Sequence, residues 1–134
     1  SAESYFFYGL ALRYAGRFNE AILNFKKAIR LNPVKPLNYL NNMAWAYNYL
    51  GEYEQAIVLW NGTLERNPDY LFANMGLTVA YQLSGNEIKA REAAAEVMRI
   101  KPNLTISKIA KGQKARNVDI KSILEAMRKA GIPE

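Results

Sequence analysis

Three stretches of this chain repeat one another with a period of 34 to 35 residues. Each stretch carries a glycine near its middle and a proline at its end, at Gly16, Gly51 and Gly85 and at Pro33, Pro68 and Pro102. A unit of this length holds two helices and a turn, and it cannot bury its apolar surface alone. The period therefore predicts an all-α solenoid in which neighbouring units stack on one another.

Local signals within each unit predict a helix, a tight turn and a second helix. Glycine favours the left-handed conformation that ends a helix, and proline cannot continue one. Small residues recur near the start of each second helix, at Ala21, Ala56 and Ala90, where they let two helices approach closely. In the first helix Tyr5, Tyr8 and Leu12 follow helical spacing, so we expect them to belong to its buried stripe.

The residues shared by the three units match a known pattern. The first unit has Tyr8-Gly9, Leu12, Ala21, Phe25, Ala28 and Pro33, the second Leu40, Met43-Ala44, Tyr47, Ala56, Trp60 and Pro68, and the third Leu77, Tyr81, Gly85, Ala90 and Pro102. With these residues the chain resembles the tetratricopeptide repeat family over residues 2 to 102. The resemblance implies a right-handed superhelix of three repeats, at 2–35, 36–69 and 70–103, whose first helices line a concave groove.

Residues 104–134 lack the repeat pattern but carry two amphipathic segments, near 105 to 115 and 119 to 130. Asp119 is placed to cap the second segment, and we expect both to cover the apolar side of the third unit. The ending EAMRKAGIPE, with REAAAEVMRIKPN before it, resembles the C-terminal repeat region of bacterial signalling proteins that carry an adenylate cyclase or DNA-binding domain. This resemblance implies a bacterial regulatory context and a longer parent protein.

Composition excludes most familiar active sites. The chain has no cysteine and no histidine, which removes thiolate nucleophiles, histidine acid/base chemistry and the commonest zinc ligands. Its carboxylates form no catalytic constellation, so we assign no catalytic residue and expect no metal and no cofactor. No run of 18 apolar residues is present, so we expect no membrane partner and a cytoplasmic protein.

The second unit is rich in asparagine on the side opposite its apolar stripe. Asparagine offers donors and an acceptor together, which suits it to hydrogen-bond the backbone of an extended peptide. We therefore predict a protein or peptide partner held in an apolar, neutral groove, with Trp45 and Tyr49 as anchors. The predicted groove residues are Phe6, Leu10, Arg13, Asn38, Asn41, Asn42, Trp45, Asn48, Tyr49, Phe72, Met75, Val79 and Gln82.

Tetratricopeptide domains that hold the acidic C-termini of heat-shock chaperones use lysine, arginine and asparagine at fixed groove positions. This chain keeps only Asn42 of that set and has Phe6, Leu10, Phe72 and Gly76 at the other places, which argues against that ligand.

Charge and aromatic content leave two alternatives open. The net charge of +6 sits at the two ends, since residues 1–35 and 103–134 each carry +4. Lys108, Lys111 and Lys114 recur along one helical face that could contact nucleic acid or an acidic partner. No aromatic residue is interleaved with them, so a solvated face explains them better than nucleic-acid binding does. Aromatic residues at positions 5 to 8 exceed what one helix can bury, which suggests a weak homodimer.

Overall fold

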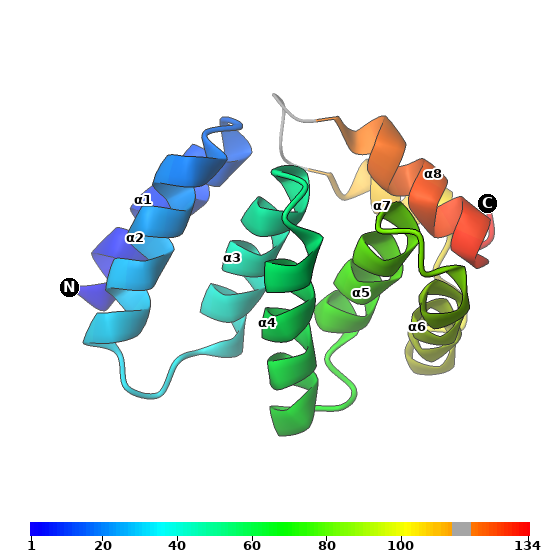
Figure 1. Ribbon diagram of the computed structural model, residues 1–134, viewed down its shortest axis with the longest axis horizontal. Helices are drawn as coiled ribbons and strands as arrows, with labels where there is room; N and C mark the ends of the chain where they lie inside the picture. Colours follow the sequence, from blue (N-terminus) through cyan, green and yellow to red (C-terminus); the bar gives the residue numbers. More distant parts are fainter. Residues whose placement is uncertain (114–118) are drawn as a thin grey trace.

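The computed structural model describes residues 1–113 and 119–134 of the chain. In these residues it has eight helices and no strand: α1 (Ala2–Tyr14), α2 (Phe18–Leu31), α3 (Leu37–Tyr49), α4 (Tyr53–Arg66), α5 (Leu71–Leu83), α6 (Glu87–Ile100), α7 (Ile106–Lys111) and α8 (Ile120–Ala130). Helices α1 to α6 form three pairs that stand in a row, and α7 and α8 lie at one end of it (Figure 1). The predicted all-α architecture is confirmed. No helix of the described part is both long enough and apolar enough to cross a bilayer.

The turn inside each helix pair is built in the same way three times. Gly16, Gly51 and Gly85 have φ of 81°, 78° and 90°, a region that favours glycine. After each glycine, the next backbone N–H donates to a carbonyl five residues back, as from Arg17 to Leu12 at 2.8 Å. This bond satisfies a carbonyl that the ending helix leaves free. The predicted turns are confirmed.

Large side chains pack on small ones where the helices approach. An added Cβ at Gly9 would lie 2.8 Å from the ring of Phe25, and one at Gly76 would overlap the ring of Trp60. Trp60 is fully buried, and its indole Nε1–H donates to Oδ1 of Asn41 at 2.8 Å. One side chain of α4 therefore joins α3 to α5. The alanines predicted at close approaches, Ala21, Ala56 and Ala90, are all fully buried.

The prediction for the buried stripe of α1 is confirmed for Leu12 and wrong for Tyr5 and Tyr8. Tyr5 and Tyr8 are exposed, whereas Phe6, Gly9 and Leu12 are buried. Phe6 stacks on Tyr39 of α3 with ring centroids 4.4 Å apart. The close approach of Gly9 to Phe25 sets this rotation, because it brings the glycine and not a tyrosine against α2.

The C-terminal helices close one end of the solenoid. Helix α8 packs on α5, α6 and α7, and its buried residues include Ile123, Met127 and Ala130. The Asp119 side chain accepts from the backbone N–H of Ser122, so the predicted N-cap is confirmed. A backbone bond of 2.7 Å from Ile106 N–H to the Pro133 carbonyl ties the start of α7 to the end of the chain. The first tail segment forms a helix of only six residues, shorter than expected.

Candidate functional site: the concave groove

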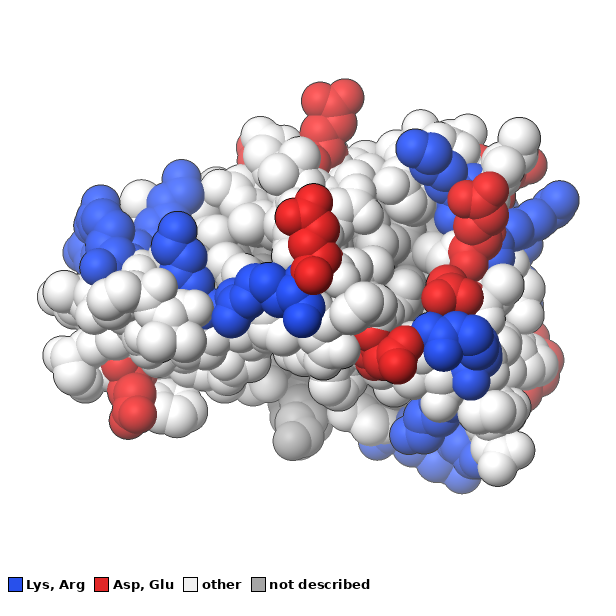
Figure 2. All heavy atoms as spheres, turned by 90° about the horizontal axis from the view of Figure 1, so that it is seen from below, with Lys and Arg blue, Asp and Glu red and all other residues white. Residues whose placement is uncertain are grey.

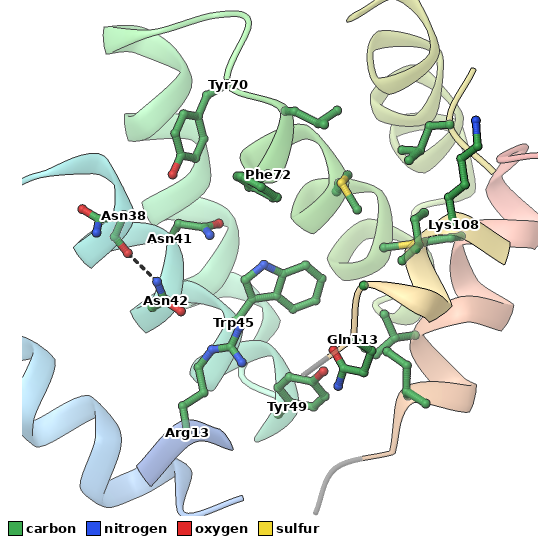
Figure 3. A pocket seen from close by; sticks show the side chains of 18 of the residues that line it. Arg13, Asn38, Asn41, Asn42, Trp45, Tyr49, Tyr70, Phe72, Lys108 and Gln113 are labelled. Carbon is green, nitrogen blue, oxygen red and sulfur yellow. Dashed lines mark hydrogen bonds between the residues drawn. The ribbon is translucent and has the colours of Figure 1, made fainter. Parts of the chain in front are cut away.

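A cavity of about 550 Å³ lies between the first helices of the three pairs and the C-terminal helices. Helices α1, α3 and α5 supply one side, while α7, the residues after it and α8 supply the other (Figure 3). The groove is lined by Arg13, Tyr14, Asn38, Asn41, Asn42, Trp45, Tyr49, Tyr70, Leu71, Phe72, Met75, Lys101, Leu104, Lys108, Ile109, Gly112, Gln113, Ile120, Ile123 and Met127. A hollow of this size is in the range of ligand pockets in proteins.

The structure divides the thirteen predicted groove residues into two groups. Those that line the cavity are Arg13, Asn38, Asn41, Asn42, Trp45, Tyr49, Phe72 and Met75. Those outside its lining are Phe6, Leu10, Asn48, Val79 and Gln82. Of the second group, Phe6 belongs to the core between the first two pairs, and Val79 is fully buried against α6 and α8. Their placement in the groove was wrong because it followed the mistaken phase of α1 and did not foresee the cover that α8 provides.

The asparagines of α3 do not form one open face. Asn38 is exposed and Asn42 half-buried, and Nδ2 of Asn42 donates to the backbone carbonyl of Asn38 at 2.8 Å (Figure 3). Asn41 is buried and holds Trp60, so its role is structural. Asn48 is buried as well, and its side-chain N and O have no hydrogen-bond partner within the described residues. Only Asn38 and Asn42 are placed to meet a ligand backbone.

Two aromatic side chains at the floor of the groove are held by other rings. Trp45 meets Trp60 edge-on with centroids 5.0 Å apart, and Tyr49 stacks on Phe18 of α2 at 4.8 Å. Burial raises the pKa of the Tyr49 hydroxyl, an effect that the nearby Arg13 opposes. Because both rings are fixed before anything binds, they can offer apolar area at little entropic cost.

Arg13 brings a positive charge into this apolar setting. Its guanidinium carbon lies 5.1 Å from the centroid of the Tyr14 ring, and Figure 3 shows the group beside Trp45 and Tyr49. Burial lowers the pKa of the guanidinium, while Tyr49 and Tyr14 act in the opposite direction. Its Nε is buried and has no hydrogen-bond partner within residues 1–113 and 119–134. A desolvated guanidinium of this kind is suited to receive an anion.

The groove is positively charged rather than neutral. All charged residues among those that line it are basic: Arg13, Lys101 and Lys108. Lys108 and Arg13 lie on opposite sides of the hollow (Figure 3). The expectation of a neutral groove was wrong because it considered only the first helices of the repeats, whereas two of the three cations come from beyond α6.

The sequence did not predict that the tail forms one wall of the groove. Leu104, Ile109 and Gln113 face α3 and α5 across the groove, although the tail was expected to cover only the third unit. Lys108 also donates from Nζ to the carbonyl of Asn103 at 2.8 Å, and Lys111 is exposed. The third member of the predicted basic face, Lys114, lies outside the described residues. Contact of this face with nucleic acid was the alternative to a solvated face, and it stays untested.

Comparison with known proteins agrees with this geometry. The fold and the groove define a tetratricopeptide repeat solenoid. The tetratricopeptide repeat family model matches residues 2–33 and 37–70, so the first two helix pairs are tetratricopeptide repeats.

Two curated relatives are similar over part of the chain. The photosystem I assembly protein Ycf3 of Synechococcus sp. (strain WH7803) is 33% identical over 81 residues, which is 56% of this chain and 47% of that protein. The uncharacterized protein ycf37 of Guillardia theta is 22% identical over 99 residues, which is 69% of this chain and 56% of that protein. This chain therefore spans about half the length of these relatives.

Solved structures of low sequence identity share the fold. The first tetratricopeptide domain of Spaghetti (RPAP3), bound to the HSP90 peptide SRMEEVD, has a TM-score of 0.75 at 19% identity and covers 96% of this chain and 89% of its own. The tetratricopeptide domain of Arabidopsis OM64 has a TM-score of 0.74 at 20% identity and covers 82% of this chain and 90% of its own. These relatives do not test the resemblance of the tail to bacterial cyclase and regulator proteins, which stays a prediction.

Proposed function

We propose that this chain is a non-catalytic binding module whose concave groove holds a short acidic segment of a partner protein. The observation that carries the proposal is the groove itself, where fixed aromatic rings, two asparagines and cations from three elements surround one hollow of about 550 Å³. Pre-organised aromatic and arginine side chains are the groups that dominate the energy of protein recognition.

The chemistry of the segment follows from the groups that it would meet. An aromatic or large aliphatic side chain would lie against Trp45 and Tyr49, and Asn42 would bond the backbone beside it. A carboxylate next to that anchor would reach Arg13, whose buried Nε is without a partner in the described structure. Charge-assisted hydrogen bonds of this kind are about twice as strong as neutral ones.

The names of similar proteins support a role in handling other proteins. One relative is named for the assembly of photosystem I, and one structural neighbour holds an HSP90 peptide. We do not propose the HSP90 ligand for this chain. At two of the groove positions where chaperone-binding domains carry polar residues, this chain has Phe6 and Gly76, and both are buried. The basic groups lie elsewhere in the groove. From the resemblance of the tail to bacterial regulators, we further propose that the chain serves as the scaffold or regulatory part of a larger bacterial protein.

A peptide selection followed by titration tests this proposal. We expect a random display library to yield peptides with an acidic residue beside an aromatic or large aliphatic one. The chain has two tryptophans, of which Trp60 is fully buried and Trp45 faces the groove. Binding should therefore change the tryptophan fluorescence, and the change should disappear in Trp45→Phe.

Substitution of Arg13 gives the sharpest result. Arg13→Gln should weaken binding of the selected peptides by about tenfold or more, because a charge-assisted bond is lost. Peptides in which the acidic residue is replaced by its amide should bind both proteins alike. Arg17→Gln is the matched control, since Arg17 lies exposed in the turn after α1 and pairs with Glu20 of α2. Selected peptides that bind Arg13→Gln and Trp45→Ala as tightly as the unchanged protein would contradict the proposal.

The asparagine pair to test is Asn38 and Asn42. The sequence pointed to Asn42 with Asn48, but Asn48 is 2% exposed and its replacement would change the core. Asn38→Ala with Asn42→Ala should weaken all selected peptides by a similar factor, whatever their side chains, because the amides would contact the backbone.

A further inference from the structure

The three cations of the groove stand in two separate places. Arg13 comes from α1 at one end of the row, whereas Lys101 and Lys108 follow α6 at the other end (Figure 1). Figure 3 shows the Arg13 guanidinium and the Lys108 ammonium on opposite sides of the hollow, with the indole of Trp45 between them. A carboxylate binds within about 3 Å of the group that donates to it. One carboxylate therefore cannot serve both places.

The surface between the two places is apolar. The partly buried side chains of Trp45, Tyr49, Met75 and Ile109 line the cavity and pack against the same core cluster. They form a floor that α3, α5 and α7 supply together. An apolar side chain of a bound segment can lie on this floor, whereas a charged one would lose its hydration there. The acidic side chains of a segment are thus directed to the two ends of the floor.

Neither place is neutralised by the protein itself. Arg17, Arg99 and Arg128 each pair with a carboxylate on the surface. Among the residues that the structure describes, Arg13 and Lys108 have no such pair. The buried Nε of Arg13 also lacks a hydrogen-bond partner there. Lys108 gives one of its three donors to a backbone carbonyl, which leaves two for a ligand.

We infer that the groove recognises two acidic side chains of one segment, one on each side of an apolar or aromatic anchor. This specificity rests on the proposed function, since both concern the same groove. Arg13 receives the carboxylate on one side of the anchor, and Lys108 receives the carboxylate on the other. The anchor is then an internal residue of the segment, so binding does not require a free chain end.

The charge distribution of the chain favours such a segment. Residues 1–35 and 103–134 each carry a net charge of +4, while 36–68 carry −2 and 69–102 carry 0. Figure 2 shows Lys and Arg side chains gathered at the end of the molecule that holds α1 and α2. The two basic segments supply opposite sides of the groove, so an acidic segment is attracted to both. Salt should therefore weaken a peptide with two acidic residues more than a peptide with one.

A double-mutant cycle between protein and peptide tests the inference. The selected peptide is made with an amidated C-terminus, and in two further versions one acidic residue or the other is replaced by its amide. Arg13→Gln should weaken only versions that keep one of the acidic residues, by about tenfold. Lys108→Gln should weaken only versions that keep the other, by about threefold, because Lys108 is exposed. The version that lacks this second acidic residue should bind Lys108→Gln and the unchanged protein alike, which shows that the variant is folded.

Lys111→Gln is the matched control, because Lys111 is exposed on the same helix but does not line the cavity. It should leave the binding of every version unchanged, whereas Lys108→Arg should restore most of what Lys108→Gln loses.

Two results would overturn the inference and leave the proposed function standing. One is a library that yields peptides with a single acidic position, and the other is a loss in Lys108→Gln no larger than that in Lys111→Gln. If no peptide is selected, or if Arg13→Gln and Trp45→Ala bind the selected peptides unchanged, the proposed function fails and the two-site specificity fails with it.

Discussion

The two ends of this solenoid differ in whether their apolar surface is covered. At the α1 end, large aromatic side chains stand exposed on a surface shaped for stacking. At the α6 end, α8 packs on α5 and α6 and buries Ile123, Met127 and Ala130, so a segment outside the repeats supplies the cover. A repeat array needs a cover at each end, because every unit buries its apolar side only on its neighbour. The contrast teaches that the closed end depends on a segment that is not a repeat at all.

The largest expected difference between the ends comes from placing the same charge at each. Met127→Asp would bury a carboxylate under α8, which should cost about 3 kcal/mol or more of the free energy of unfolding. Tyr8→Asp should change it by less than about 0.5 kcal/mol, because the side chain is exposed. Urea unfolding at a concentration low enough to exclude association measures both. Equal losses in the two variants would show that the ends do not differ in this way.

An intermediate effect on the free energy of unfolding is expected in the middle of the row, where Trp60 of α4 contacts α3 and α5. Trp60→Phe keeps a ring against Gly76 but removes the indole N–H that bonds Asn41. Because Oδ1 of Asn41 then stays buried without its donor, we expect a loss of about 1 to 3 kcal/mol. Hydrogen exchange should locate the loosening in α3 to α5 and leave the contact of α1 with α2 unchanged. Trp60→Phe with Asn41→Leu should recover part of the loss, since no polar atom would be left unpaired.

The smallest effect concerns how the closed end responds to acid. Hydrogen bonds from Ser122 lower the pKa of the Asp119 carboxyl, and Arg128 lowers that of Glu134. A depressed pKa means that each carboxylate stabilises the fold above its unfolded pKa of about 4 and loses this contribution as pH falls through the lower folded value. The protection factors of the amides in α8 should therefore fall in acid more than those of the amides in α3. Asp119→Asn should reduce this extra sensitivity, and an equal response of the two helices would contradict it.

The turns and the close approaches of paired helices could be predicted because each depends on a residue type at one position in the repeat. The glycines that adopt positive φ and the alanines at close approaches lie where the sequence placed them. The rotation of α1 could not be predicted in the same way. Four consecutive aromatic residues give no preferred apolar face, so the choice falls to the contact of Gly9 with Phe25, which lies outside the helix.

The groove was predictable only in part because it is assembled from distant segments. Trp45, Tyr49 and Phe72 follow from the repeat register. The burial of Asn41 depends on an indole nineteen residues away that needs an acceptor. The positive character depends on Lys101 and Lys108, which reach the groove only because the tail folds back across it. Periodicity within one repeat contains no information on either contact.

The tail that closes the solenoid is also a wall of the groove, and this shared part has a thermodynamic consequence. Any occupant that touches both Trp45 and Ile109 requires a docked tail, so its apparent affinity is reduced by the fraction of molecules whose tail has come away. By reciprocity the occupant holds the tail in place. Mechanical tension applied at Glu134 would then act on the ligand as well, and pulling on the C-terminus would empty the groove.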